Sequence, residues 1–171
     1  MLRKGLVFAA LCLVPATFAS AQVRGPWELE LSGSAVNGSK FNGVSAAANV
    51  EIGYFLSDQL EVNVRQSISY TDIGVPKALD GSTRVGADFH LPLGDQNQFV
   101  PFAGANFGYV YGDNVNDTWE AAPEGGIKVF VNNSTFVFAQ VEYQFFFKSG
   151  STSDSFKNGQ FVWTLGLGFR F

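Results

Sequence analysis

Apolar and polar residues alternate strictly at the end of the chain, over residues 160–171. A β-strand points successive side chains to opposite faces. The segment therefore predicts a strand with one broad apolar face and one small, mostly polar face. The apolar positions are Phe161, Trp163, Leu165, Leu167, Phe169 and Phe171.

The same alternation recurs along the chain and predicts eight strands. Their apolar faces carry no charged residue, and the charged residues within the strands all lie on the opposite faces. A charge facing lipid at mid-depth costs about 2–4 kcal/mol, whereas a soluble sheet exposes its polar face. No segment is left to cover the apolar faces, so lipid is their expected partner. The predicted strands are residues 27–32, 44–54, 60–70, 83–93, 99–111, 121–131, 137–147 and 160–171.

The connections between these strands alternate in length. Short turns at one end and long loops at the other are typical of outer-membrane barrels, whose short turns face the periplasm. We therefore expect an all-β fold, an eight-stranded antiparallel up-and-down transmembrane β-barrel with extracellular long loops. An even strand number places both termini in the periplasm, and closure removes the open edges that hydrocarbon does not tolerate. The short turns are expected near residues 57–58, 94–96 and 132–133, and the long loops at residues 37–43, 72–81, 112–117 and 148–158.

The N-terminus has the pattern of a cleaved secretory signal peptide. Arg3 and Lys4 precede an apolar stretch at residues 5–14, which is too short to cross a bilayer. Small residues at 19–21 form a cleavage site. We expect a signal peptide at residues 1–21, a short periplasmic segment at 22–26 and the barrel domain at 27–171.

Removing the signal changes the charge and the cysteine content. It leaves 11 − 2 = 9 basic residues against 15 acidic ones, a net charge of −6. That balance argues against nucleic acid as a partner. The single cysteine, Cys12, lies within the signal, so no disulfide is expected in the mature chain.

The inward faces predict a charged network inside the barrel. Eight strands enclose a space that side chains can fill, and charges held away from water need partners. We expect Arg65 and Arg84 at the centre of this network, and inward glycines that make room for Phe102, Phe130 and Phe138. A polar plug is the favoured interpretation, and a narrow ion conduit is the alternative. The expected network residues are Glu30, Glu51, Arg65, Arg84, Asp88, Glu124, Lys128, Glu142 and Arg170.

Catalytic and metal chemistry have weak support in the sequence. His90 is the only histidine, and Asp88 shares its face, so a hydrolase triad with a serine is conceivable. The predicted register, however, turns His90 towards the lumen. Residues 113–117 carry alternate oxygen ligands but lack the glycine and distant glutamate of a calcium loop. We expect no catalytic residue, no cofactor and no metal.

The chain resembles the small outer-membrane β-barrels of the OmpA-like, porin-family type found in the Gram-negative cell envelope. The resemblance rests on residues 19–21, 100–104, 126–130 and 165–171. It implies that the C-terminal strand is the signal for the barrel-assembly machinery. Phe171 would carry that role, with Phe169 and Trp163 beside it. The sequence ends with the last strand, so the peptidoglycan-binding domain of some relatives is not expected.

The resulting prediction is an integral outer-membrane barrel with a structural or surface-interaction role. Its expected partners are outer-membrane lipid, lipopolysaccharide and the barrel-assembly machinery, and a closed barrel is expected to be a monomer. Two alternatives stay open. One is a barrel enzyme that modifies lipid A or phospholipid, and the other is a soluble periplasmic ligand-binding barrel.

Overall fold

The computed structural model describes residues 25–37, 43–72, 77–93, 97–113, 117–147 and 159–171. The described part of the chain contains no helix of the length and hydrophobicity needed to cross a bilayer. Its elements are the strands β1 (Trp27–Asn37), β2 (Val44–Phe55), β3 (Leu60–Thr71), β4 (Ala78–His90), β5 (Phe99–Gly112), β6 (Thr118–Phe130), β7 (Thr135–Phe147) and β8 (Gln160–Arg170).

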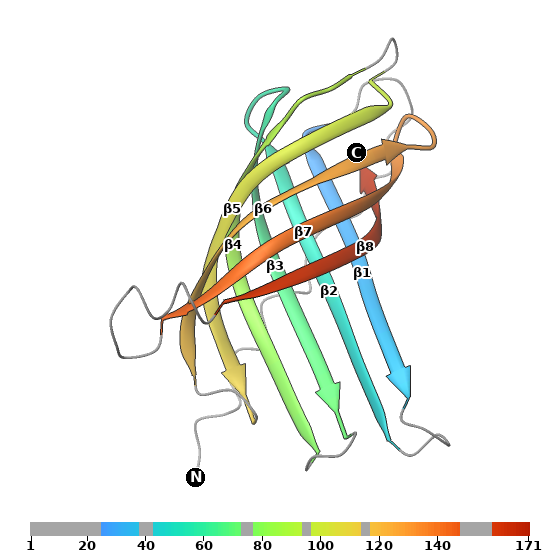
Figure 1. Ribbon diagram of the computed structural model, residues 1–171. Coiled ribbons are helices and arrows are strands. Elements are labelled where there is room, and N and C mark those ends of the chain that lie inside the picture. Colours follow the sequence, from blue (N-terminus) through green and yellow to red (C-terminus); the bar gives the residue numbers. More distant parts are fainter. Residues whose placement is uncertain (1–24, 38–42, 73–76, 94–96, 114–116, 148–158) are drawn as a thin grey trace.

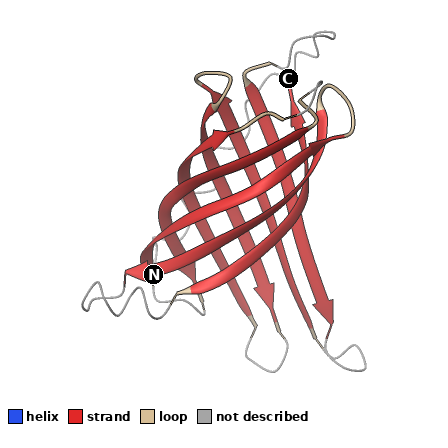
Figure 2. Ribbon diagram, turned by 45° about the horizontal axis from the view of Figure 1, so that its top comes forward, coloured by secondary structure: helices blue, strands red, loops and turns tan. Residues whose placement is uncertain are grey.

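The eight strands form one closed barrel (Figures 1 and 2). Each strand pairs antiparallel with the next along the chain, and β8 returns to pair with β1. The predicted fold class is therefore confirmed. The N-terminal end of β1 and the C-terminal end of β8 lie at the same end of the barrel, because Trp27 and Phe171 exchange two backbone hydrogen bonds.

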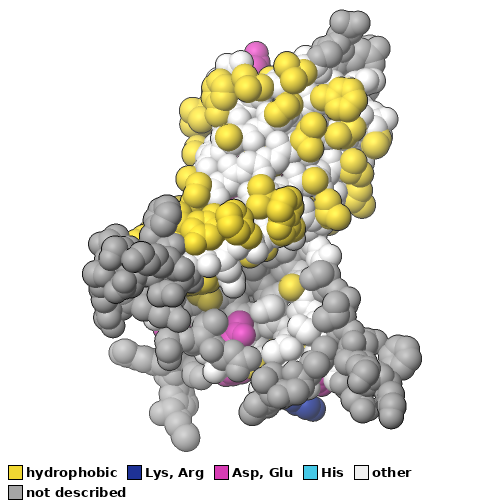
Figure 3. All heavy atoms as spheres, in the orientation of Figure 1, with side chains coloured by type: hydrophobic (Ala, Val, Ile, Leu, Met, Phe, Trp, Pro, Cys, Tyr) yellow, Lys and Arg dark blue, Asp and Glu magenta, His cyan; other side chains and the backbone are white. Residues whose placement is uncertain are grey.

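Side-chain alternation decides which face of each strand turns inward. On β3, Val62 and Val64 are exposed on the outer wall, whereas Glu61, Asn63 and Arg65 are buried. Figure 3 shows hydrophobic side chains spread over the outer wall on the face in view. The predicted separation of apolar and charged faces is confirmed throughout the described strands.

One polar group on the outer wall shows how such a position is tolerated. The side-chain amide of Gln66 donates to the Tyr111 hydroxyl at 2.9 Å, and its carbonyl accepts from the Thr83 hydroxyl at 2.7 Å. The three side chains come from three neighbouring strands, β3, β4 and β5. Their mutual hydrogen bonds reduce the cost of facing an apolar medium.

Glycine in β8 makes room for aromatic rings inside the barrel. A Cβ atom added at Gly168 would lie 2.0 Å from the Phe136 ring, and one at Gly166 would lie 2.5 Å from the Phe138 ring. A side chain at either position would force the rings apart. The expected space for Phe138 is therefore supplied by Gly166, and that for Phe102 by Gly126, where an added Cβ would lie 2.7 Å from the ring. Gly168 and Phe136 were not in the expected set.

Several strand boundaries differ from the prediction. β4 begins at Ala78 rather than at residue 83, so the expected long loop at residues 72–81 is wrong in extent. The Asp80-Gly81 pair is typical of a turn, but Gly81 lies opposite Tyr111, and an added Cβ would lie 2.7 Å from its ring. Glycine at that position accommodates a ring within the sheet.

β1 and β6 are also longer than expected. β1 continues to Asn37, and β6 begins at Thr118 rather than at residue 121. β4 itself ends at His90, but an antiparallel bridge between Leu93 and Phe99 continues the pairing to the residues where the predicted strands ended and began. The expected turn residues 94–96 and most of the long loops lie outside the described residues.

The outer wall gives a direct test of the register. Val64→Arg places a charge on a lipid-facing position and should cost about 2–4 kcal/mol at mid-depth, so we expect a large loss of folded protein on refolding into vesicles. Ser67→Arg is the matched control, since Ser67 lies on the same strand but faces the lumen. The folded fraction is measured by gel migration without boiling, and equal losses in the two variants would refute the β3 register.

Candidate functional site

The lumen holds a set of buried charged side chains that come from β1, β2, β3, β4, β6 and β7. Each is exposed by less than a tenth, and the three cations each contact more than one acid. Charges removed from water in this way depend on one another for stability. The buried charged residues are Glu28, Glu30, Glu51, Glu61, Arg65, Arg84, Asp88, Glu120, Glu124, Lys128 and Glu142.

Lys128 forms the centre of the group nearest the chain termini. Its ammonium contacts Glu28, Glu30 at 2.9 Å and Glu61 at 3.4 Å. These acids belong to β1 and β3, whereas Lys128 belongs to β6, so the contacts cross the lumen. The ammonium donates hydrogen bonds to Glu28 and Glu61, and its contact with Glu30 is an ion pair.

Aromatic rings complete the surroundings of this ammonium. The Lys128 nitrogen lies 5.1 Å from the Phe102 ring centroid and 5.2 Å from that of Phe136. Both distances are within the range of cation–π attraction. The ammonium is therefore held by charge on one side and by ring faces on others.

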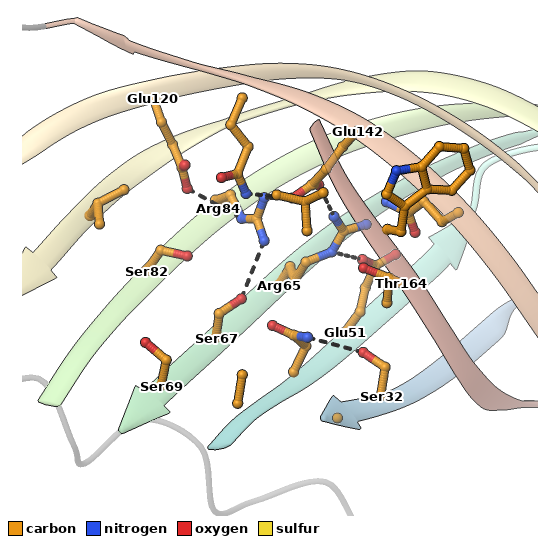
Figure 4. Close-up of a pocket in the computed structure, with 18 of the residues that line it drawn as sticks. Ser32, Glu51, Arg65, Ser67, Ser69, Ser82, Arg84, Glu120, Glu142 and Thr164 are labelled. Carbon is orange, nitrogen blue, oxygen red and sulfur yellow. Dashed lines mark hydrogen bonds and ion pairs between the residues drawn. The ribbon is translucent and has the colours of Figure 1, made fainter. Parts of the chain in front are cut away.

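Arg65 forms the second group, further from the termini (Figure 4). Its Nε contacts Glu51 on the neighbouring strand, and its Nη1 lies 2.9 Å from both Glu124 and Glu142 across the lumen. The guanidinium thus joins β2 and β3 to β6 and β7. Guanidinium suits this position because its fixed fork of donors can serve several carboxylates at once.

Arg84 extends this group towards β4. Its Nη1 lies 2.8 Å from Glu142, and its Nε lies 3.4 Å from Glu120. Its Nη2 also donates to the Ser67 hydroxyl at 3.2 Å. Glu142 therefore accepts from both arginines and links them into one network.

An apolar cluster closes the barrel beside the termini. Val100, Phe130, Phe136 and Phe138 pack there, and Phe136 is fully buried. These residues lie next to the β6–β7 turn at residues 131–134, at the end where Phe171 pairs with Trp27. The lumen is thus filled by rings at this end and by ion pairs above them.

The structure places seven of the nine residues expected in the network within its ion pairs, namely Glu30, Glu51, Arg65, Arg84, Glu124, Lys128 and Glu142. The other two expected residues bind elsewhere. Asp88 is buried in the lumen and accepts from the Asn63 amide at 2.6 Å. Arg170 donates to the Gly25 carbonyl at 3.0 Å, and its guanidinium lies 3.5 Å from the Phe55 ring centroid.

Sequence reasoning left three acids out of the expected network. Glu28 and Glu61 face inward as predicted, but the strand pattern gave no reason to pair them with Lys128 across the lumen. Glu120 lay outside the expected β6 segment. The inward positions Thr118, Glu120 and Ala122 do alternate with the outward Trp119 and Ala121, so the signal was present in the sequence.

The candidate catalytic pair does not form. His90 lies in the lumen, where its Nε2 is 3.3 Å from Glu61, and its ring stacks on Phe102 at 5.5 Å. Asp88 bonds to Asn63 instead, and both His90 and Asp88 are almost completely buried. Within the described ranges, no group of acidic, histidine or cysteine residues could hold a metal ion. The expected loop at residues 113–117 lies largely outside those ranges.

A cavity of about 490 Å³ lies between the arginine network and the end of the barrel with the loops (Figure 4). The arginines and their acids form its floor, and hydroxyl and amide side chains form much of its wall. The polar uncharged lining residues are Ser32, Asn49, Ser67, Ser69, Ser82, Gln140, Gln144, Gln160 and Thr164.

The three residues expected to guide assembly all lie on β8 or directly after it. Phe169 and Trp163 project from the outer wall, and Trp163 is 80% exposed. Phe171 follows the strand and joins Trp27 through backbone hydrogen bonds of 2.9 and 3.0 Å. The C-terminal residue is therefore part of the barrel seam.

Comparison with solved structures identifies the fold. The N-terminal β-barrel domain of Pseudomonas aeruginosa OprF matches with a TM-score of 0.61 and 18% identity, over 86% of this chain and 98% of that domain. The chain has the fold of the small outer-membrane β-barrels. This agrees with the resemblance noted in the sequence.

Two further barrels of this fold match at similar levels. The outer membrane protein OprG of Pseudomonas aeruginosa has a TM-score of 0.58 and 12% identity, over 88% of this chain and 99% of OprG. Neisserial surface protein A has the same TM-score and identity, over 85% of this chain and 95% of that protein. No protein-family model and no curated protein sequence matches the chain. At these identities the likeness concerns the fold alone.

The ion pairs of Lys128 provide a test of how much the buried charges contribute to the stability of the barrel. Lys128→Met removes the cation and leaves three buried acids without it, which should cost about 3–5 kcal/mol in the free energy of unfolding. We expect the urea unfolding midpoint of the refolded barrel to fall accordingly. Lys77→Met is the control, because Lys77 is exposed outside the strands.

A compensating variant separates charge from packing. Adding Glu28→Gln, Glu30→Gln and Glu61→Gln to Lys128→Met removes the unpaired charge and should recover part of the lost stability. If Lys128→Met unfolds at the same urea concentration as Lys77→Met, the ion pairs across the lumen do not stabilise the barrel.

Proposed function

We propose that the chain is an integral protein of the bacterial outer membrane, with its outer wall against lipid and lipopolysaccharide. The observation that carries this proposal is the distribution of side chains. Large apolar groups such as Val64, Val85 and Leu165 are exposed by half or more on the outer wall, while most charged groups of the strands are buried inside. Water would disfavour that arrangement, and hydrocarbon favours it.

The proposed orientation places both termini and the β2–β3 and β6–β7 turns in the periplasm. These two turns, residues 56–59 and 131–134, are short and lie at the terminal end of the barrel. Outer-membrane barrels have their short turns on the periplasmic side. The opposite end, with the connections at residues 38–43, 72–77, 113–117 and 148–159, would then face outward.

The proposed role is structural or in surface interactions, with a plugged lumen. The ion pairs of Arg65, Arg84 and Lys128 cross the barrel, and the cluster around Phe136 fills its terminal end. We propose no enzymatic activity, because His90 lies buried between Glu61 and Phe102 and lines no part of the cavity. A monomer is proposed because the barrel closes on itself. The barrel-assembly machinery is proposed to read Phe171, Phe169 and Trp163.

Membrane residence is tested by fractionation. The folded protein is expected in the outer-membrane fraction, extracted only by detergent, and its gel mobility should shift on boiling because a folded barrel resists detergent. A protein recovered from the periplasm without detergent would instead support the soluble ligand-binding barrel.

The plugged lumen is tested in planar lipid bilayers. The inserted wild-type barrel should show no stepwise current, because ring packing and ion pairs both fill the lumen. Insertion is verified in the same sample by the mobility shift on boiling. Regular current steps from inserted wild-type protein would contradict the plugged lumen and support the narrow ion conduit.

A further inference from the structure

The seam between β1 and β8 is paired over only part of its length. The register runs from Glu28 opposite Arg170 to Ser32 opposite Gly166, and Trp27 joins Phe171 below it. Both strands continue further. β1 stays paired with β2 up to Asn37, and β8 stays paired with β7 down to Gln160.

Two strand edges therefore face each other without pairing, at Gly33–Asn37 of β1 and at Gln160–Leu165 of β8. Within the described residues, each of the other seven neighbouring pairs is matched along most of its length. Figure 1 shows β8 diverging from β1 towards the end with the loops. Below β8 in Figure 3 the surface is hollowed, and an acidic side chain is visible within the hollow.

Side-chain exposure agrees with this divergence. Along β8 the outward side chains become more exposed beyond the paired part: Phe169 is 39% exposed and Leu167 51%, whereas Leu165 is 73% and Trp163 80%. The last two lie on the part of β8 that pairs with β7 but not with β1. They form an apolar rim along one side of the opening.

The opening begins within the lipid-facing part of the wall. Trp27 to Ser32 is five residue steps, which on a strand tilted by about 40° corresponds to about 12 Å along the membrane normal. The apolar band of such barrels is about 25 Å tall. Under the proposed orientation, the unpaired edges lie at the level of the outer leaflet.

Unpaired backbone at that depth needs another source of hydrogen bonds. Irregular backbone is tolerated in a membrane where it lines a water-filled cavity. The 490 Å³ cavity has room for water and a largely polar lining, and it reaches both edges, because its lining includes Ser32 and Gly33 from β1 and residues 162–165 from β8. The cavity in the lumen and the opening in the wall are thus continuous.

The lining restricts what could occupy the cavity. It contains five acids, Glu30, Glu51, Asp80, Glu120 and Glu142, and two bases, Arg65 and Arg84, which are already bound to acids. An anionic group would meet an excess of negative charge. The serine, threonine, asparagine and glutamine side chains of the wall suit an uncharged group with hydroxyls.

We propose that this cavity binds an uncharged, hydroxyl-bearing amphiphile with a single alkyl chain. The polar head lies among Ser67, Ser69 and Ser82, and the chain leaves sideways between Gly33 and Leu165 into the outer leaflet. The cavity volume falls within the range of small-molecule sites. Because ion pairs form its floor, the site retains the amphiphile and does not conduct it to the other side. This inference rests on the proposed membrane location.

The experiment closes the seam with a reversible bond. Extending the register places residue 33 opposite residue 165, and paired strands bring such Cα atoms within disulfide range. The double variant Gly33→Cys with Leu165→Cys is prepared in the mature chain, which has no other cysteine if the signal is removed. The control is Leu31→Cys with Leu167→Cys, which lie directly opposite in the paired part and outside the cavity.

Binding is measured at Trp163, made the sole tryptophan by Trp27→Phe and Trp119→Phe. Refolded protein in phosphatidylcholine vesicles is titrated with a monoacylglycerol brominated on its alkyl chain, which quenches nearby tryptophan. We expect a saturable component of quenching in addition to the linear part from probe dissolved in lipid. Oxidation of the Gly33/Leu165 pair should weaken the saturable component at least tenfold, and reduction should restore it.

Three results would overturn the inference. They are linear quenching alone in the unlinked protein, equal saturable binding in the oxidised and reduced Gly33/Leu165 variant, and an equal loss in the Leu31/Leu167 control. A brominated alkylsulfonate of the same chain length should give no saturable component, and equal binding would refute the head-group assignment. The mobility shift on boiling is recorded for every sample, so failure of the barrel to insert is distinguished from failure to bind.

Discussion

The exclusion of charge from hydrocarbon is the constraint on which the structure depends. In a closed antiparallel wall each side chain faces either the lipid or the lumen, and the alternation along each strand decides which. Ionised groups must then face inward, and where the packed part of the lumen holds them away from bulk water they have to neutralise one another. Lys128, Arg65 and Arg84 do so by reaching acids on the far wall. The cross-lumen network is thus a consequence of the lipid-facing exterior.

The alternating pattern was sufficient to predict the inward and outward faces, because these depend only on the two-residue period. The number of alternating segments and the lengths of their connections predicted the strand number and the antiparallel order. It was less informative about strand ends. Asp80-Gly81 has the composition of a turn, but the glycine accommodates the ring of Tyr111 across the sheet. That requirement involves a neighbour thirty residues away and is not visible locally.

The partners of the inward charges were harder to predict than their direction. Pairing between neighbouring strands follows from register, and Arg65 does lie opposite Glu51. Contacts across the lumen depend on barrel tilt and stagger, which fix which depths coincide on opposite walls. For that reason Glu28 and Glu61 were not assigned to Lys128. Arg170 was expected in the network, but it contacts Gly25 and Phe55 instead.

The pairing of Trp27 with Phe171 has a consequence for folding kinetics. This contact joins the two most distant parts of the barrel sequence, so its loop-closure entropy is the largest of any strand pair. The barrel cannot close before β8 pairs with both β7 and β1, and the sheet edges of β1 and β7 remain open until then. Topologies dominated by such non-local pairing fold slowly. Closure of the β1–β8 seam is therefore expected to be a slow step, and the edges of β1 and β7 would need protection against aggregation until it is complete.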